Sequence, residues 1–415
     1  MKKVLSILLS VAMIVLCFAA CGKTDGDKSS TGKAANVKVG FIFLHDENST
    51  YDKNFITAAE EACKKAGVEI LKKTNISETQ ACYDAAAELV DEGCNVIFAD
   101  SFGHEPYIIQ AAKKFPEVQF LHATGTKAHT EGLSNYHNAF ASIYEGRYLA
   151  GVAAGMKLNE MISSGKITAD KAKMGYVGAY TYAEVISGYT SFYLGAKSVC
   201  PSVTMEVTFT GSWYDETAEK EAAQKLINNG CVLISQHADS MGAPTACEAA
   251  GVPNVSYNGS TVSACPNTFI VSSRIDWAPY LEYAIDCVKN GKAIDTDWTG
   301  TLSTGSVVLT DVNTKAAAEG TQAKIDEVKA ELEGGKLHVF DTSAFTVTVS
   351  DSKNKNATVD ADGHLTGYKA DIDSDADNTG DTEVVENGYF AESAKRSAPY
   401  FDLQIDGIHL LNTAF

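Results

Sequence analysis

Apolar residues along this chain fall into short runs of strand type that alternate with amphipathic stretches of helical period. The run VKVGFIFL at 37–44 is followed by a polar loop and a predicted helix at 55–66. Three further strands (68–72, 95–99, 118–122) alternate with two helices (78–92, 106–115). Strands and helices in alternation predict a parallel sheet covered by helices, and hence an α/β fold.

The stretch 133–156 interrupts this rhythm. An extended segment at 133–140 passes without Gly or Pro into a helix predicted at 142–156, with Ser142 as its N-cap. Apolar side chains recur in this helix at four-residue spacing, which gives it one apolar face. We expect the chain to cross here from one α/β lobe to a second, with the functional cleft between the two.

After this crossing, the alternation resumes. A helix at 276–290 is expected to return to the first lobe, and a late helix at 314–332 is expected between strands at 307–310 and 337–341. We predict one lobe from residues 37–140 plus 273–299, and another from residues 141–272 plus 300–345. The other elements predicted for the second lobe are five strands (173–178, 204–208, 232–235, 254–257, 268–272) and three helices (185–199, 217–229, 244–250).

The C-terminal part of the chain is first polar and then apolar again. Residues 346–387 are predicted to be an acidic insert, and residues 388–415 a segment that packs on a lobe. The stretch DIDSDADNTGD at 371–381 places oxygen ligands at alternate positions, as calcium loops do. It lacks the Gly at the sixth position and the Glu at the twelfth that such loops carry. We therefore favour a solvated insert and predict no metal site.

The N-terminus has the pattern of an export signal. Lys2 and Lys3 precede an apolar run at 4–18 that is short for a membrane span, and the sequence FAACG follows. This pattern looks like a bacterial lipobox and predicts a signal peptide at 1–20, a diacylated Cys21 and a flexible tether at 21–36. The expected location is the extracytoplasmic face of the cell membrane. The alternative is an ordinary signal peptide with an incidental cysteine.

The amino-acid composition argues against nucleic acid as a binding partner. A formal net charge of −19 leaves no basic surface for nucleic acid, while 45% hydrophobic residues are typical of a globular protein. Eight cysteines follow Cys21, and an even count in an exported chain permits disulfides. We favour mostly free, buried thiols, because several of them stand where helices would place core residues and a chain of this size needs no cross-links.

No catalytic signature is present. The chain lacks the patterns GxSxG, HExxH and GxxxxGK[ST]. His45, His122 and His237 follow predicted strands near aspartates, but no nucleophile has an evident base. Polar groups scattered one per loop are typical of a binding cleft. We predict a binding protein that is not an enzyme and needs no cofactor.

The candidate site lies on loops that leave the carboxyl ends of strands, where open α/β sheets bind ligands. Trp213 follows a strand in a polar loop, and Tyr51, Phe55 and Phe102 stand on the facing rim. A flat heteroaromatic ring stacked there would gain about 1–3 kcal/mol. Polar partners for its edge are Asp239, Ser101, Asn258 and Glu184. The plainer roles are a core position for Trp213, a helix cap for Asp239 and a first-turn acid for Glu184.

Several ordered segments resemble the basic membrane protein family of lipoproteins, which are substrate-binding proteins of ABC importers. They are DSFG at 100–103, AAKKFP at 111–116, HATG at 122–125, YEGRY at 144–148, EVISG at 184–188, SWYD at 212–215 and QHADS at 236–240. The resemblance covers about residues 37–340. It implies a type I periplasmic binding fold, with two Rossmann-like lobes of parallel sheet joined by a hinge that crosses several times. The closest likeness is to a subgroup associated with adenine.

One departure bears on the ligand. Nucleoside-binding members carry Asp-Lys-Ser-Phe-Asn in the first loop, whereas residues 52–56 here read Asp-Lys-Asn-Phe-Ile. Asn54 of this motif joins the predicted site. If the missing Asn holds the ribose, its loss favours a free base. Arg274 and Asn258 replace a Lys and an Asp of the family, and Arg274 has an alternative partner in Asp276.

The sequence thus predicts a monomeric, lipid-anchored receptor that captures a purine and hands it to an ABC permease. A nucleobase such as adenine is favoured over a nucleoside. Three other readings stay open: the same fold with another small ligand such as a flavin or a sugar-like signal, an enzyme acting on nucleosides, and an adhesin that uses the acidic insert.

Overall fold

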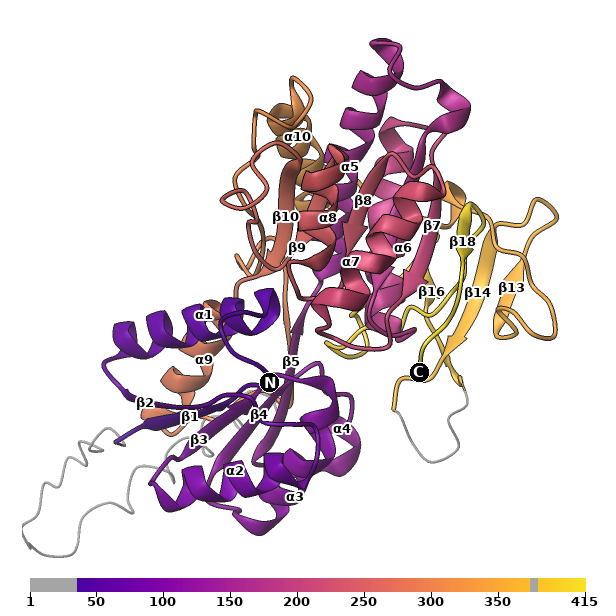
Figure 1. The fold of residues 1–415 in the computed structure, drawn as a ribbon. Helices are drawn as coiled ribbons and strands as arrows, with labels where there is room; N and C mark the ends of the chain where they lie inside the picture. Colours follow the sequence, from indigo (N-terminus) through magenta and orange to yellow (C-terminus); the bar gives the residue numbers. More distant parts are fainter. Residues whose placement is uncertain (1–35, 374–379) are drawn as a thin grey trace, which may run out of the picture. The chain divides into compact units, whose positions relative to one another are not determined.

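The computed structural model describes residues 36–373 and 380–415. The predicted signal peptide at 1–20, Cys21 and nearly all of the tether at 21–36 lie outside these residues. Residues 374–379, in the middle of the stretch considered for calcium, also lie outside them. The described chain contains two large sheets of mainly parallel strands, and helices cover both faces of each sheet (Figure 1).

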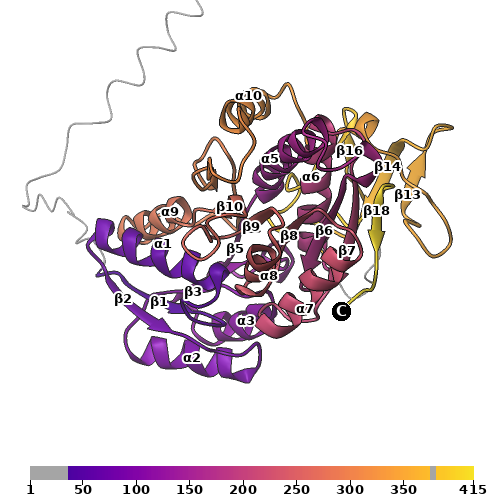
Figure 2. The same ribbon diagram turned by 45° about the horizontal axis from the view of Figure 1, so that its top comes forward.

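The first sheet has six parallel strands in the order β11-β5-β4-β3-β1-β2. The helices α1 (Thr50–Ala66) and α9 (Ala278–Lys289) lie side by side on one face, whereas α2 (Gln80–Asp91) and α3 (Glu105–Lys114) cover the other (Figure 2). This arrangement is called the first lobe below. Its strands are β1 (Lys38–Ile42), β2 (Glu69–Lys73), β3 (Val96–Ala99), β4 (Gln119–Ala123), β5 (Tyr136–Ala141) and β11 (Asp297–Gly300), and a short helix α4 (Ala128–Glu131) precedes β5.

The second sheet has the order β12-β10-β9-β8-β6-β7-β18, with only β12 antiparallel to its neighbour. The helices α5 (Ile143–Ser163) and α6 (Ala183–Val199) cover one face, and α7 (Glu216–Asn228) and α8 (Gly242–Ala250) the other. This is the second lobe. Its strands are β6 (Lys173–Gly178), β7 (Thr204–Phe209), β8 (Leu233–Gln236), β9 (Asn254–Tyr257), β10 (Phe269–Ile275), β12 (Val307–Leu309) and β18 (Ile408–Leu410).

Helices α5 and α6 pack with their backbones in contact. A Cβ added to Gly151 would lie 2.0 Å from the Phe192 carbonyl oxygen, and one added to Gly195 would lie 2.0 Å from the Tyr148 carbonyl oxygen. Only glycine permits this approach. Because α5 is buried nearly all round, its apolar residues form no single stripe, and the helix runs beyond the predicted end at 156 to Ser163.

The chain passes between the lobes three times: between β5 and α5, between β10 and α9, and between β11 and β12. The expected return of the helix at 276–290 is confirmed, because α9 packs on α1 of the first lobe. Two late predictions are wrong. The helix predicted from 314 begins only at Thr321, after Gly320 with φ 78°. Residues 337–341 form no strand beyond an isolated bridge from Asp341 to Tyr389, and the His338 ring stacks on Tyr389 at 3.9 Å.

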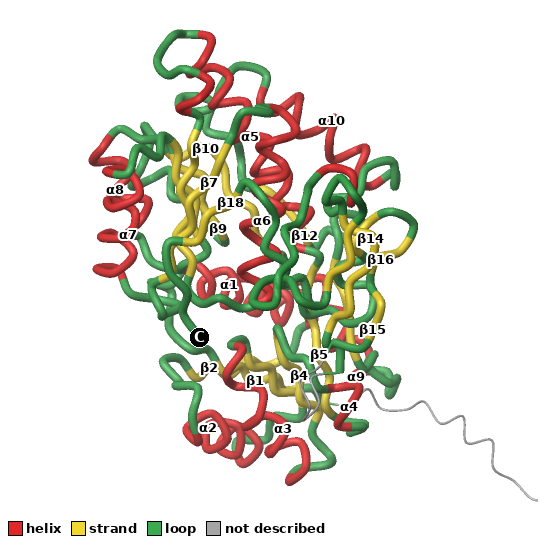
Figure 3. Tube along the Cα trace, turned by 90° about the vertical axis from the view of Figure 1, so that its right-hand side faces the viewer, coloured by secondary structure: helices red, strands yellow, loops and turns green. Residues whose placement is uncertain are grey.

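The C-terminal region contains more order than its polar composition predicts. The strands β13 (Ala357–Val359), β14 (Leu365–Ala370) and β15 (Thr382–Glu383) form a small antiparallel sheet, and β16 (Val385–Glu386) pairs with β17 (Tyr389–Phe390). Four of the six residues of β14 are buried, and Tyr368 packs on Phe390, which contacts Phe401. The last strand, β18, lies beside β7 (Figure 3).

All eight described cysteines are free and buried, which confirms the prediction for them. Burial raises the pKa of the Cys63 thiol to about 12, so this thiol stays protonated at neutral pH. Within residues 36–373 and 380–415, no helix combines the length and the apolar character that crossing a bilayer requires.

Candidate functional site

A cavity lies between the two lobes, at the carboxyl ends of both sheets. Its empty volume is about 380 Å³, a figure that includes the open mouth. Loops after β1, β3 and β4 of the first lobe and after β6, β7 and β8 of the second supply its lining, as expected for open α/β sheets. Six of the nine predicted site residues line it: Tyr51, Ser101, Phe102, Glu184, Trp213 and Asp239.

Three rings of the second lobe pack together beside the cavity, and Trp213 is the one of them that lines it. Trp213 is half-buried, and Tyr180 meets it edge-on with ring centroids 5.1 Å apart. Tyr182 stacks on Tyr180 at 5.0 Å and contacts Trp213 at 6.1 Å. We call Tyr180, Tyr182 and Trp213 the aromatic wall. Phe102 of the first lobe, 39% exposed, lines the cavity and contacts Tyr182 directly, with ring centroids 5.3 Å apart.

Phe55 has a different role from the predicted one. Its side chain is fully buried and stacks on Trp277 with centroids 4.2 Å apart, so it does not line the cavity. Its ring supports Tyr51 from behind at 5.1 Å. Tyr51 itself faces the cavity and donates its hydroxyl to the Asp100 carbonyl oxygen at 2.8 Å. Stacking by the first lobe is thus left to Tyr51 and Phe102.

Asn54 and Asn258 line a neighbouring hollow rather than the cavity. Asn54 donates to the Ile275 carbonyl oxygen and accepts from Arg274, which also reaches Asp276 at 3.5 Å as the alternative reading expected. Asn258 adopts φ 65°, a left-handed conformation that Asn tolerates. Its amide donates to Asp239 Oδ1 at 3.2 Å. Asn258 therefore acts on the cavity through Asp239.

Asp239 is buried at the cavity and does not cap a helix, since α8 begins after Met241 without a side-chain cap. Burial, reinforced by the carboxylates of Asp52, Glu219 and Glu184, raises the pKa of Asp239 well above its usual range. The neutral acid, which can donate as well as accept a hydrogen bond, is favoured in the closed cavity.

The other acids of the first lobe are held in place by the loop after β1. Burial opposes ionisation of Asp52, but hydrogen bonds from His45 and Ser49 outweigh it and lower its pKa. Burial and the nearby Asp52 raise the pKa of Asp100 well above its usual range. The Ser101 hydroxyl donates to Glu78 at 2.6 Å, which fixes its direction at the cavity edge.

Six lining residues were absent from the predicted site: Leu44, His45, Asp52, Thr124, His237 and Tyr257. His237 directly follows β8 and Tyr257 ends β9, so the rule that placed Asp239 at a strand end also applies to them. Thr124 directly follows β4, so the same rule applies to it. It adopts φ 63°, which is rare for a β-branched residue and is the kind of strain that gathers at functional sites.

A polar relay reaches the cavity from the core of the second lobe. Arg147 is fully buried and donates to the Tyr176 hydroxyl at 3.0 Å. Tyr176 lies 3.2 Å from His237 Nδ1, and His237 Nε2 lies 3.2 Å from Glu184. Arg147 can only donate, so the Tyr176 hydroxyl accepts from it and donates its own proton in a hydrogen bond to His237 Nδ1. The imidazole then carries its N–H at Nε2 and donates to Glu184. A buried cation thus orients a carboxylate at the cavity.

One pair of hydrogen bonds joins loops of the two lobes beside the cavity. The Thr50 backbone N–H and the Thr50 hydroxyl both donate to the main-chain carbonyl oxygen of Asp239, at 2.9 and 3.1 Å. We call this pair the interlobe clasp. Thr50 begins α1 and Asp239 follows β8, so the clasp joins a helix N-terminus of one lobe to a strand end of the other.

Residues 41–336 match the profile of the Bmp family, described as ABC transporter substrate-binding protein, PnrA-like. The chain belongs to this family. The resemblance stated from the sequence is confirmed, and this PnrA-like protein is accordingly a solute-binding component of ABC transport. The C-terminal region from 337 onward lies beyond the match.

Relatives of this PnrA-like protein differ in the ligands in their names. A purine-binding protein of Brucella abortus is 31% identical over 310 residues, which are 73% of this chain and 83% of that protein. A nucleoside-binding ABC transporter protein of Lactococcus lactis is 24% identical over 256 residues, 60% and 68% of the two chains. A Haloferax volcanii protein, provisionally named as glucose-binding, is 27% identical over 332 residues, 78% of each chain.

Solved structures confirm the predicted fold. An ABC transporter solute-binding protein of Conexibacter woesei superposes with a TM-score of 0.59 at 21% identity, covering 73% of this chain and 98% of its own. One of Aeropyrum pernix gives 0.62 at 17% identity, covering 76% and 94%. Both are solute-binding proteins, in keeping with the type I periplasmic fold.

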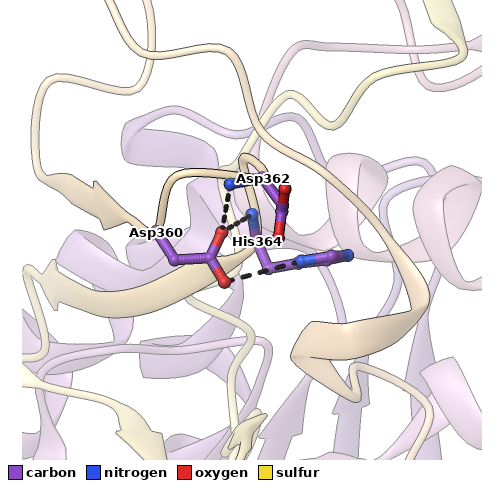
Figure 4. Close-up of side chains that lie close together, drawn as sticks. All are labelled: Asp360, Asp362 and His364. Atoms are coloured by element: carbon purple, nitrogen blue, oxygen red, sulfur yellow. Dashed lines mark hydrogen bonds and ion pairs between the residues drawn. The ribbon is translucent and has the colours of Figure 1, made fainter.

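Asp360, Asp362 and His364 are the described residues whose grouping could suit a metal ion (Figure 4). They form the turn between β13 and β14. Asp360 Oδ1 accepts from the backbone N–H groups of Asp362 and His364 at 3.0 and 2.9 Å, and its Oδ2 lies 3.6 Å from His364 Nδ1. The hydrogen bonds of a tight hairpin turn therefore account for this grouping.

Glu219 holds together the two second-lobe loops that carry Trp213 and Asp239. Its buried carboxylate accepts from the Asp215 N–H at 3.1 Å and from the Ser240 N–H at 3.3 and 3.1 Å. Burial raises its pKa from 4.5 to about 7. The folded protein therefore binds this proton more tightly than the unfolded chain, and the stability it contributes is lost as pH rises from about 4.5 through about 7.

We expect Glu219→Gln to remove this pH dependence. The free energy of unfolding of the wild type, minus that of the variant, should fall by about 2–3 kcal/mol between pH 4.5 and 7.5. Urea unfolding at several pH values measures this difference, and other titrating groups, common to both proteins, cancel in it. Parallel stability curves for the two proteins would contradict the assignment.

Proposed function

We propose that this PnrA-like protein is an extracytoplasmic receptor for a purine nucleobase, such as adenine, which it delivers to the permease of an ABC importer. The observation that carries the proposal is a cavity lined by the rings of Trp213, Tyr51 and Phe102 together with buried acids. The Brucella abortus relative, whose name states purine binding, supports the same ligand class.

In this proposal the flat ring lies between Trp213 and the first-lobe rings. Asp239 and Glu184 accept hydrogen bonds from the ring N–H or the exocyclic amine, and the neutral form of Asp239 can also donate to a ring nitrogen. Apolar faces with a few convergent polar groups are typical of small-molecule sites. The ionised carboxylate of Asp52 at the cavity also disfavours anionic ligands such as nucleotides, because phosphate would meet a like charge.

Two observations support a free base over a nucleoside. Ile56 stands where nucleoside-binding members carry the last Asn of the first-loop motif. In addition, the interlobe clasp and Asn258 separate the cavity from the neighbouring hollow, which leaves a ribose little room there. Loading and release then require the lobes to part about the three crossing segments, with the clasp breaking on opening.

Lipid attachment at Cys21 and a monomeric state complete the proposal. Mass spectrometry of the mature N-terminus tests the lipid, with a diacylglycerol-modified Cys21 as the expected species. Sedimentation of the purified protein tests the monomer.

Titration calorimetry of the purified protein tests the ligand. We expect heat with adenine and weaker or no heat with adenosine, inosine and guanosine, while hypoxanthine and guanine rank the bases. Tighter binding of a nucleoside than of its base would move the assignment to the nucleoside. Absence of heat with every purine, from a folded sample, would defeat the proposal. D-Glucose belongs in the same series because the name of the Haloferax volcanii relative states glucose binding. Riboflavin belongs in it because a flavin is one of the alternative ligands considered from the sequence.

A further inference from the structure

The last eight residues of the chain run alongside the strand that leads to Trp213. Strand β18 pairs in parallel with β7, with Ile408 opposite Met205 and Leu410 opposite Val207. The Leu411 N–H then donates to the Val207 carbonyl oxygen at 2.8 Å. Residues 408–415, called the tail below, thus follow β7 to its carboxyl end (Figures 1 and 3).

Asn412 fixes the end of β7. Its Oδ1 accepts from the Phe209 N–H at 2.8 Å and from the Thr208 hydroxyl at 3.0 Å, and its Nδ2 donates to the Phe209 carbonyl oxygen at 2.9 Å. One amide side chain therefore satisfies both backbone groups of the last residue of β7, four positions before Trp213. Without Asn412, this end of the sheet would be an unpaired edge.

Ala414 fixes the other loop of the aromatic wall. Its carbonyl oxygen accepts from the Thr181 N–H at 2.7 Å, and its own N–H donates to the Thr181 hydroxyl at 2.9 Å. Thr181 is buried and stands between Tyr180 and Tyr182. The tail is therefore bonded to both loops that carry the aromatic wall, one through Asn412 and the other through Ala414.

We propose that the tail positions the aromatic wall for ligand binding, with Asn412 and Ala414 as positioning residues. The inference rests on the proposed function for its effect on affinity. The tail lies beyond the residues that match the family, so it would be an addition of this chain to the shared binding fold. Rings held before the ligand arrives lose less conformational freedom on binding, which is the general benefit of preorganisation.

The first test needs no ligand. Protein labelled with 5-fluorotryptophan has three ¹⁹F resonances, and Trp213→Phe identifies the one from the aromatic wall. In Asn412→Ala and in a chain ending at Leu411, we expect the Trp213 resonance to shift or broaden while those of Trp277 and Trp298 stay in place. Thr413→Ala is the matched control, because both side chains are exposed and that of Asn412 is the one that bonds to β7. An unchanged Trp213 resonance in both tail variants overturns the proposal.

The second test measures adenine affinity. We expect Asn412→Ala to weaken it about 10-fold, Asn412→Asp to weaken it less because Asp keeps both acceptor bonds, and Thr413→Ala to leave it unchanged. Thr181→Val removes one bond from the loop side and gives a second variant should a tail variant not fold. Lower thermal stability with unchanged affinity and an unchanged Trp213 resonance would show a merely structural role. If the wild type binds no purine, the proposed function fails while the ¹⁹F comparison still decides the role of the tail.

Discussion

Replacement of Trp213 by alanine is expected to weaken adenine binding by about 10- to 100-fold. The indole is the largest ring of the aromatic wall, and loss of a stacking partner costs about 1–3 kcal/mol per base. A further loss follows because the half-buried Tyr180 and Tyr182 lose the ring they pack against. Isothermal titration of wild type and variant measures the ratio of dissociation constants directly.

Two substitutions serve as controls for Trp213→Ala. Trp213→Phe keeps a stacking face and should recover most of the affinity. Trp298→Phe changes a tryptophan that packs on Tyr280 in the first lobe, outside the cavity, and should leave affinity unchanged. Equal affinity of Trp213→Ala and the wild type would place the ligand away from the aromatic wall.

Gly195→Ala is expected to lower the free energy of unfolding by about 2–3 kcal/mol, the upper part of the range for overpacked cores. The added methyl would lie 2.0 Å from the Tyr148 carbonyl oxygen, so α5 and α6 must separate. This cost exceeds the gain of about 1 kcal/mol that alanine brings to a helix interior. Equilibrium unfolding in urea provides the measurement.

Gly259→Ala is the matched control for Gly195→Ala. Its new methyl would meet Thr50 at 3.8 Å, an ordinary contact, and its backbone is not left-handed. We expect a change within about 0.5 kcal/mol, as for substitutions away from packed contacts. Should Gly195→Ala prove as harmless as this control, the close backbone packing of α5 and α6 would be refuted.

Much of the fold could be predicted because each strand and the helix after it leave a recognisable pattern of apolar residues in their own segment of the sequence. Buried parallel strands read as apolar runs, and the loops after them supply ligand contacts, which is why Trp213, Asp239 and Ser101 were placed at the cavity. Phe55 was misplaced for a physical reason. It shares a helical face with Tyr51, but lies one turn deeper, where Trp277 arrives from far along the chain to cover it.

The C-terminal region shows where local pattern fails. Short strands such as β15 and β18 carry too few residues for an alternation to be recognised, and their partners are distant in sequence. Residues 346–387 are mostly polar, so the few positions that are buried in the folded protein, such as Tyr368, do not stand out in the sequence. The pairing of β18 with β7 depends on an edge of the second sheet that no local signal in the tail reveals.

The interlobe clasp separates two tasks that a receptor must perform. Thr50 bonds to the peptide oxygen of residue 239, which every amino acid possesses, whereas the carboxyl group of that residue faces the cavity. A change of side chain at 239 would alter which molecule is accepted without removing the latch that shuts the lobes. A lineage could thus exchange one nutrient for another by point mutation while the signal sensed by its permease stayed the same.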